Sequence, residues 1–221
     1  MKIIALPIAV AFTLFLSPPG FAETDSLPTA MQSCANMTVC EQTAVKQPFP
    51  GAGNNLEVAV GGGHFSFFPP DAVTDVAVGW GESPNYVIRL KGGKLMASEE
   101  RLVRLDNTGL CSANESPAPT LARFLFLQTA KEKEPDDKCQ QTIFRLAFFQ
   151  KSSSIFKDAQ HLVWFEKNNL EIYLANVSGI DHDTYAMVTH RDKPFHYLVI
   201  RTQGVDRERL LKTLATIKIK P

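Results

Sequence analysis

The chain has 221 residues, enough for one domain or two small ones with a substantial buried core. It carries 23 lysine and arginine residues and 23 aspartate and glutamate residues, so its formal net charge is zero. Nucleic-acid binding and polybasic membrane anchoring both rest on a surplus of basic residues. The charge balance therefore argues against both, and we expect no nucleic-acid partner.

Residues 1–22 predict a cleavable export signal. Lys2 gives a short positive region, residues 3–16 are almost entirely apolar, and small residues lie at positions −3 and −1 of a cleavage site after Ala22. The apolar stretch is too short for a comfortable membrane span, and no later apolar run reaches the ~18 residues that a spanning helix needs. We therefore expect a periplasmic protein, of bacterial type, with no stable membrane span after cleavage.

Four cysteines, an even number in an exported chain, predict two disulfides. They are Cys34, Cys40, Cys111 and Cys139. Three pairings are possible, and we favour Cys34–Cys40 with Cys111–Cys139 because each cysteine then pairs with its nearest neighbour in sequence. The second bridge would stabilise the fold by about 3 kcal/mol through the unfolded chain. A zinc site is the competing interpretation, but the CxxC spacing is absent.

The first part of the exported chain predicts a leader followed by short strands. Residues 23–55 form an N-terminal leader with a short helix at 27–37 and a turn-rich linker at 48–55, and residues 56–221 form a single domain. Glycine-rich breaks separate apolar runs in the first half of that domain, which is typical of strands joined by turns. We expect strands at 56–60, 64–68, 73–78, 86–90, 95–97 and 102–105.

The second half predicts helices and then a sheet. Apolar residues at helical spacing indicate helices at 120–133 and 140–149. Short polar turns join four further strands, which therefore reverse direction as an antiparallel meander. These strands are expected at 161–166, 170–177, 185–189 and 195–201. An amphipathic helix at 206–217 follows, and its apolar stripe can cover one face of the meander. The fold class is thus α+β, a mainly antiparallel sheet with packed helices.

The end of the chain resembles a known fold. Residues 195–201 (FHYLVIR) followed by the helix at 206–217 are similar to the ends of exported PsbP/Mog1-like domains. This loose resemblance covers about the last 60 residues and implies an α+β module built for binding rather than catalysis. It carries no functional residues across.

Histidines offer the clearest candidate chemistry. Four of the five lie late in the chain: His161, His182, His190 and His196. His190 and His196 could be neighbours across a hairpin, but a metal site needs three or four converging ligands, and the HxH and HExxH spacings are absent. The glycine-rich run 61–63 before His64 precedes a strand rather than a helix, so it indicates a turn rather than an anion site. We predict no metal, no cofactor and no catalytic residue.

These observations favour a protein that binds another protein and is not an enzyme. We expect an inhibitor or immunity-type protein that neutralises a toxin or hydrolase in the bacterial envelope. Trp80, on a glycine-flanked loop, and nearby Tyr86 form one candidate contact pair. His182 and Asp183, at a hairpin end, form the other.

Two alternatives stay open. A carrier of small ligands or lipids would need an apolar cavity lined by residues such as Phe124, Phe144 and Phe148. A hydrolase with a Ser/His site would need one of the four late histidines beside a serine and a carboxylate. The strained GxSxG turn that often holds a nucleophilic serine is absent.

Overall fold

The computed structural model describes residues 38–51, 56–79, 84–129, 132–152, 160–177 and 183–220. The predicted signal, the predicted helix at 27–37, and Cys34, Trp80 and His182 lie outside the described residues. The fold is α+β, as predicted, and its centre is an eight-stranded sheet in the order β1-β7-β8-β9-β10-β6-β5-β4. All neighbouring strands in it are antiparallel except β1 and β7, which are parallel.

The strands of the large sheet are β1 (Val45–Lys46), β4 (Val73–Gly79), β5 (Asn85–Leu90), β6 (Gly93–Arg101), β7 (Gln160–Lys167), β8 (Leu170–Asn176), β9 (Thr184–His190) and β10 (His196–Gln203). A second sheet has three strands, β2 (Val58–Val60), β3 (Phe65–Phe67) and β11 (Lys218–Ile219). The helices are α2 (Thr38–Glu41), α3 (Val103–Asn107), α4 (Pro117–Phe126), α5 (Lys138–Lys151) and α7 (Arg207–Leu214), with a 3-10 turn η1 at Ala113–Glu115.

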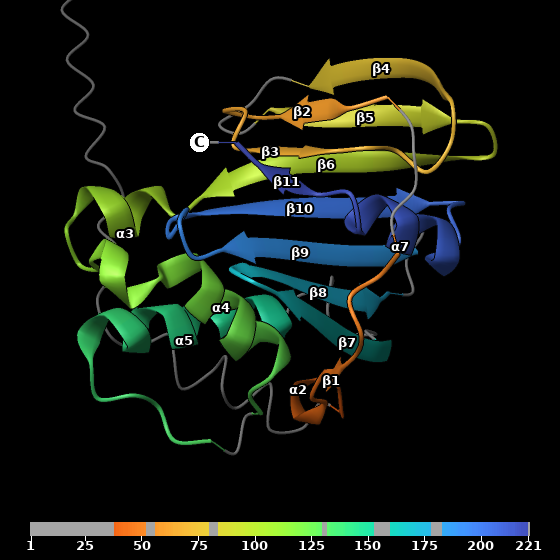
Figure 1. Cartoon of the computed structure of the whole chain (residues 1–221). Coiled ribbons are helices and arrows are strands. Elements are labelled where there is room, and N and C mark those ends of the chain that lie inside the picture. Colours follow the sequence, from red (N-terminus) through yellow and green to blue (C-terminus); the bar gives the residue numbers. More distant parts are fainter. Residues whose placement is uncertain are drawn as a thin grey trace, which may run out of the picture.

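The large sheet is covered on both faces (Figure 1). Successive side chains of a strand point to opposite faces, so each central strand contributes side chains to two hydrophobic cores. In β8, Tyr173 and Ala175 pack with α4 and α5, whereas Ile172 and Leu174 pack with the small sheet and α7. This two-sided burial explains why β8 and β9 are buried along almost their whole length.

The predicted meander and final helix are confirmed. Strands β7, β8, β9 and β10 follow one another in chain order and pair antiparallel. Helix α7 places Leu210 and Leu214 in the core that also holds Ile172 and Leu198, so its apolar stripe covers the sheet as expected. Strand β11, which pairs with β3 after this helix, was not predicted.

One predicted strand is wrong. Residues 102–105 do not extend the sheet; they lead into helix α3, which begins at Val103. Leu102 and Leu105 are both buried beneath α4 and α5, and a spacing of three residues places two side chains on one side of a helix. Strand β6, by contrast, runs well beyond the expected 95–97.

Helix α4 starts and ends earlier than the predicted 120–133. It begins at Pro117, since proline fits the first turn of a helix, where its missing N–H is not needed. It ends at Phe126, whose carbonyl accepts the N–H of Ala44 at 3.0 Å. The Gln128 carbonyl accepts a hydrogen bond from Lys151 Nζ at 2.6 Å. Distant groups therefore satisfy the carbonyls where the helix stops.

The leader contributes an edge strand to the large sheet. Val45 pairs with Val163 and Lys46 with Trp164, which makes β1 parallel to β7. Lys46 Nζ lies 2.8 Å from Glu166 Oε2, although both side chains are solvent-accessible and such pairs add little stability. Residues that the sequence assigned to a leader are thus hydrogen-bonded to the domain.

The predicted disulfide between Cys111 and Cys139 is present. It joins the segment before η1 to the first turn of α5, with a Cα–Cα distance of 5.1 Å, and both cysteines are buried. Cys40 is fully buried and is not a free thiol. Its predicted partner Cys34 lies outside the described residues, so that pairing stays a prediction.

Replacing both Cys111 and Cys139 by alanine should lower the free energy of unfolding by about 3 kcal/mol, because the bridge closes a long loop in the unfolded chain. Urea unfolding of the oxidised protein and the double variant measures this difference. A non-reducing peptide map of the unmodified protein is the control, and free thiols at these two positions would contradict the pairing.

Lys151 joins three separate segments at the end of α5. Its side chain is buried, its Nζ donates to the carbonyls of Gln128 at 2.6 Å and Gln42 at 3.5 Å, and it lies 5.8 Å from the centroid of the Phe148 ring. Burial disfavours the ammonium form and lowers the pKa of Lys151 to about 8, while Glu132 partly offsets this effect.

The buried lysine predicts that stability rises with pH. Between about pH 8 and the usual lysine pKa of 10.5, the unfolded chain holds a proton that the folded chain has released. The free energy of unfolding should therefore increase by about 1 kcal/mol from pH 7.5 to about pH 9, where unfolded tyrosines, whose pKa is about 10, are still mostly protonated. The Lys151→Met variant should lack this rise.

Urea unfolding at a series of pH values tests this expectation. The exposed Lys91, in the turn between β5 and β6, supplies the matched control Lys91→Met, which should keep the rise of the unmodified protein. An equal pH slope in the unmodified protein and in Lys151→Met would contradict the assignment.

Candidate functional site: a His–Glu–His cluster and an exposed edge strand

A buried carboxylate interrupts an apolar row on β6. Leu95 and Ala97 face the core between the large sheet and the small one, and Glu99 continues the same face two residues later. The Glu99 side chain is only 4% exposed. A charge in this position is costly unless polar groups compensate it, so its partners define the site.

His196 reaches Glu99 from the neighbouring strand. In the pairing of β6 with β10, Glu99 lies opposite Leu198 and Arg101 lies opposite His196. His196 is therefore the diagonal neighbour of Glu99 on the same face of the sheet. Its Nδ1 lies 2.8 Å from Glu99 Oε1, within hydrogen-bond distance.

His64 reaches the same oxygen from the small sheet. It lies in the turn between β2 and β3, and its Nδ1 is 2.5 Å from Glu99 Oε1. The two imidazole rings have centroids 4.6 Å apart. Gly61 permits this approach because its φ is +60° and an added Cβ would lie 2.5 Å from the Glu99 Cβ.

Three side chains thus converge, with two imidazoles sharing one carboxylate oxygen. The other oxygen, Glu99 Oε2, is buried and has no hydrogen-bond partner within the described part of the chain. Burial lowers the pKa of His196, and electrostatic repulsion from His64 acts in the same direction, while the hydrogen bond and charge of Glu99 oppose this shift. The donor atoms of His64, Glu99 and His196 all lie within 4.8 Å of one another.

Sequence reasoning did not find this cluster. It placed His64 at the start of a strand after a glycine-rich turn, named only His190 as a neighbour of His196 and ended the strand before Glu99. His190 ends β9 next to Thr189, which pairs with Tyr197, and its Nδ1 accepts a hydrogen bond from the Asp192 N–H at 3.2 Å. One pattern in the sequence could have indicated the site. Glu99 follows Leu95 and Ala97 at intervals of two residues, which places a charged side chain on the core-facing side of the strand.

The second candidate region is the edge strand β4, beside predicted contact residue Tyr86. Tyr86 is partly buried on β5 and pairs with Val78 of β4. Residues 74–79 of β4 are all exposed, and Val76 and Val78 remain 45% and 39% exposed. In Figure 1, β4 forms the upper edge of the large sheet. The predicted contact residue Tyr86 therefore lies beside an exposed apolar edge.

Asp183 lies elsewhere on the sheet and has structural partners. It immediately precedes β9, whereas Tyr86 belongs to β5, which is three strands away in the sheet order. Asp183 Oδ2 accepts the N–H of Gly204 at 2.6 Å, and its own N–H donates to the Thr202 carbonyl. Tyr86 and Asp183, the described members of the two predicted contact pairs, therefore do not lie on one surface.

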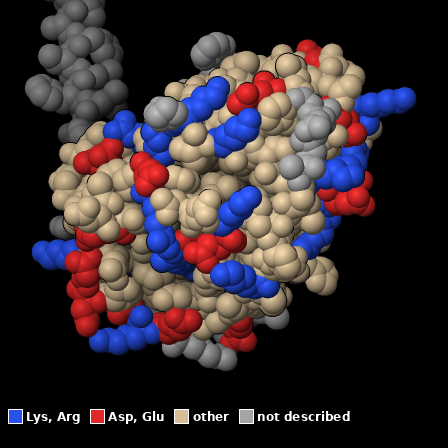
Figure 2. Space-filling model, viewed as in Figure 1, with Lys and Arg blue, Asp and Glu red and all other residues tan. Residues whose placement is uncertain are grey.

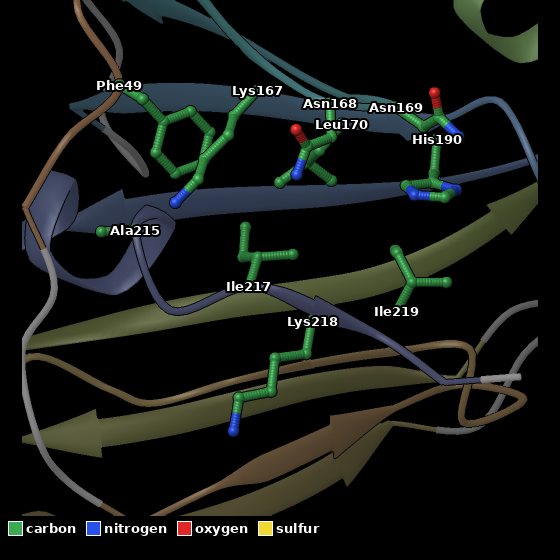
Figure 3. A pocket seen from close by; sticks show the side chains of 10 residues that line it. All are labelled: Phe49, Lys167, Asn168, Asn169, Leu170, His190, Ala215, Ile217, Lys218 and Ile219. Atoms are coloured by element: carbon green, nitrogen blue, oxygen red, sulfur yellow. The ribbon is translucent and has the colours of Figure 1, made fainter.

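A shallow groove of about 380 Å³ lies between the β7–β8 turn and the C-terminal segment. Figure 3 shows Phe49 and Lys167 on one side of it and Ile217 and Ile219 on the other. Lys167 Nζ lies 5.3 Å from the centroid of the Phe49 ring. The groove is thus lined by both charged and apolar side chains.

The aromatic cavity considered for a carrier is filled by its own side chains. The Phe124 and Phe144 rings pack edge to face with centroids 5.4 Å apart, and Phe144 and Phe148 are 4.6 Å apart. All three side chains are buried in the core beneath α4 and α5. They act as packing residues there, so these three side chains do not line the cavity that a carrier would need.

The surface charges are mixed. Figure 2 shows basic and acidic side chains interspersed over the viewed face rather than gathered into one basic field. Within the described part of the chain, no helix is long and apolar enough to cross a membrane.

No protein-family model, no curated protein and no solved structure matches this chain. The resemblance of its last residues to PsbP/Mog1-like domains therefore gains no support from these comparisons.

The close approach of Gly61 to Glu99 predicts unequal effects of two alanine substitutions. Gly61 and Gly63 both have positive φ, at +60° and +82°, but an added Cβ at Gly63 would meet no atom within 4 Å. Gly63→Ala should cost about 1 kcal/mol of backbone strain. Gly61→Ala should cost a further ~1–3 kcal/mol because the new methyl group overlaps Glu99. Urea unfolding measures both values, and equal losses would contradict the contact.

Proposed function

We propose that this chain is an exported, non-enzymatic protein that binds another protein by adding an extended segment of that partner to β4. In this proposal it acts as an inhibitor or immunity-type protein against a toxin or hydrolase of the bacterial envelope. The observation that carries the proposal is the exposed edge of β4.

The second half of β4 lacks the features that normally protect a sheet edge. Edge strands are usually blunted by lysine, proline, bulges or inward charges. In β4, an irregular register between Val73 and Asp75 and an Asp75–Arg89 ion pair of 3.4 Å protect only the beginning of the strand. Residues 76–79 (VAVG) are uncharged and exposed, and among the strands that the structure describes they pair regularly with β5 on one side only. They can pair with another extended segment.

An extended partner segment suits this edge. Main-chain hydrogen bonds give strand addition its affinity, and alternate side chains give it specificity. Val76 and Val78 lie two residues apart on one face of β4, and Tyr86 lies opposite Val78. Such pairing would sequester a loop of the bound protein, which is how an inhibitor of an exported enzyme can act without catalysis.

Site-specific photo-crosslinking tests the proposal. A photoreactive residue in place of Val76 should give a discrete adduct with one protein in source cells, whereas the same residue in place of Val103 on α3 should not. The two valines are matched, since they are 45% and 46% exposed. A synthetic peptide spanning the cross-linked segment should bind the purified protein and protect the β4 amides from hydrogen exchange.

The substitutions Val76→Lys and Val78→Lys should weaken binding of this peptide, and Val103→Lys should not. Equal adducts at positions 76 and 103, or peptide protection outside β4, would overturn the proposal. A homodimer in solution that protects β4 would also overturn it, because a second copy of the chain would then occupy the edge.

A further inference from the structure

We infer that His64, Glu99 and His196 form a binding site for a divalent transition-metal ion of the zinc type, a site that the sequence did not predict. This inference is independent of strand addition at β4. It rests on the donor set, on an unsatisfied buried oxygen and on the way the fold positions the three side chains.

The donor set fits such an ion. Zinc in proteins binds imidazole nitrogen and carboxylate oxygen, and three protein ligands leave a fourth position for water or another ligand. Here two imidazoles and one carboxylate lie within 4.8 Å of one another. Magnesium and calcium prefer all-oxygen sites, so the two histidines favour a transition metal.

The partners of Glu99 are incomplete without a cation. Among the residues that the structure describes, Glu99 Oε2 is buried without a hydrogen-bond partner, and this carboxylate forms its ion pairs with His64 and His196. The arginine nearest in register, Arg101, pairs instead with Asp106. A metal ion bound between the three side chains would supply the missing positive charge.

The buried carboxylate of Glu171 provides a comparison within the same sheet. Glu171 is as inaccessible as Glu99, but it pairs with the guanidinium of Arg123 and accepts a hydrogen bond from the Tyr173 hydroxyl at 2.6 Å. It therefore has a permanent positive partner. Glu99 has two imidazoles in the corresponding role, and imidazoles can release their protons and become metal ligands.

The fold holds the three ligands on separate, well-anchored elements. Glu99 and His196 belong to paired strands of the large sheet. His64 is fixed in its turn by hydrogen bonds from the Lys220 N–H to its carbonyl at 2.8 Å and from the Gly63 N–H to the Val60 carbonyl at 3.0 Å. Ligands held in this way need little rearrangement on binding.

The site is also open to solvent. The side chains of His64 and His196 are 31% and 23% exposed, while Glu99 is covered. An ion can therefore enter past the imidazoles and contact the carboxylate beneath them. Because His64 belongs to the small sheet, a bound ion would also tie that sheet to the large one.

Zinc titration of the untagged, metal-stripped exported chain tests the inference. Calorimetry with Zn²⁺ should give one ion per chain, and Zn²⁺ but not Mg²⁺ should raise the unfolding temperature because it binds the folded state. In NMR spectra, the imidazole signals of His64 and His196 should shift with Zn²⁺, while those of His190 should not.

Ligand substitutions locate the ion. Glu99→Gln and His64→Gln should each weaken Zn²⁺ affinity at least about a hundredfold, which is the upper end of the effect of losing an outer-shell partner. His190→Gln is the matched control and should bind like the unmodified chain. His64 lies in a partly exposed turn, so we expect His64→Gln to fold. That variant therefore tests the site even if Glu99→Gln does not fold.

Three results would overturn the inference. The folded, metal-stripped chain could fail to bind Zn²⁺, which would leave the cluster as a hydrogen-bonded triad. Binding could persist in folded His64→Gln, or it could be lost in His190→Gln, and either result would place the ion at another surface position.

Discussion

The pairing of β6 with β10 is the contact on which the rest of the molecule depends. It joins the early hairpins to the C-terminal meander through eight residue pairs, from His196 with Arg101 to Gln203 with Lys94. Without it, the large sheet would separate into two parts distant in sequence. The same register sets Glu99 beside His196, so one long-range strand pairing creates both the continuous sheet and the candidate metal site.

Burial on both faces decides where polar side chains can lie. The central strands contribute alternate residues to two cores, and a charge placed there must find a partner. Glu171 pairs with Arg123, and Lys151 donates to the backbone carbonyls of Gln128 and Gln42. Among the described residues, the partners of Glu99 are imidazoles, which can bind metal ions, and this distinguishes it from the other buried charges.

The two candidate regions lie toward the same end of the sheet. Gly79 at the end of β4 pairs with Asn85, and Asn85 pairs with Ser98, the residue before Glu99. The exposed edge and the histidine cluster are therefore separated by the width of β5 and β6. One region offers main-chain hydrogen bonds to an extended segment, and the other offers nitrogen and oxygen ligands to an ion, so they have different chemical requirements.

Local patterns in the sequence determined the elements that are apolar runs between polar turns or that follow a helical period. The meander strands are of the first kind and α5 and α7 of the second, and the proximity of Cys111 and Cys139 favoured their pairing. Patterns failed where distant groups decide the local structure. Helix α4 ends where Ala44 binds its last carbonyl and Lys151 binds the carbonyl of Gln128 just beyond it, and β1 is a strand only because β7 lies beside it.

The candidate site is decided entirely by contacts between residues that are distant in sequence. Its histidines lie 35 and 97 residues from Glu99, so no short motif contains them. The sequence shows a glutamate, two histidines and a glycine-rich turn, but not that they meet. Only the register of β6 with β10, together with the small sheet folded over that face, places two imidazoles on one buried carboxylate, because strand pairing is set by burial across the whole fold rather than by neighbouring residues.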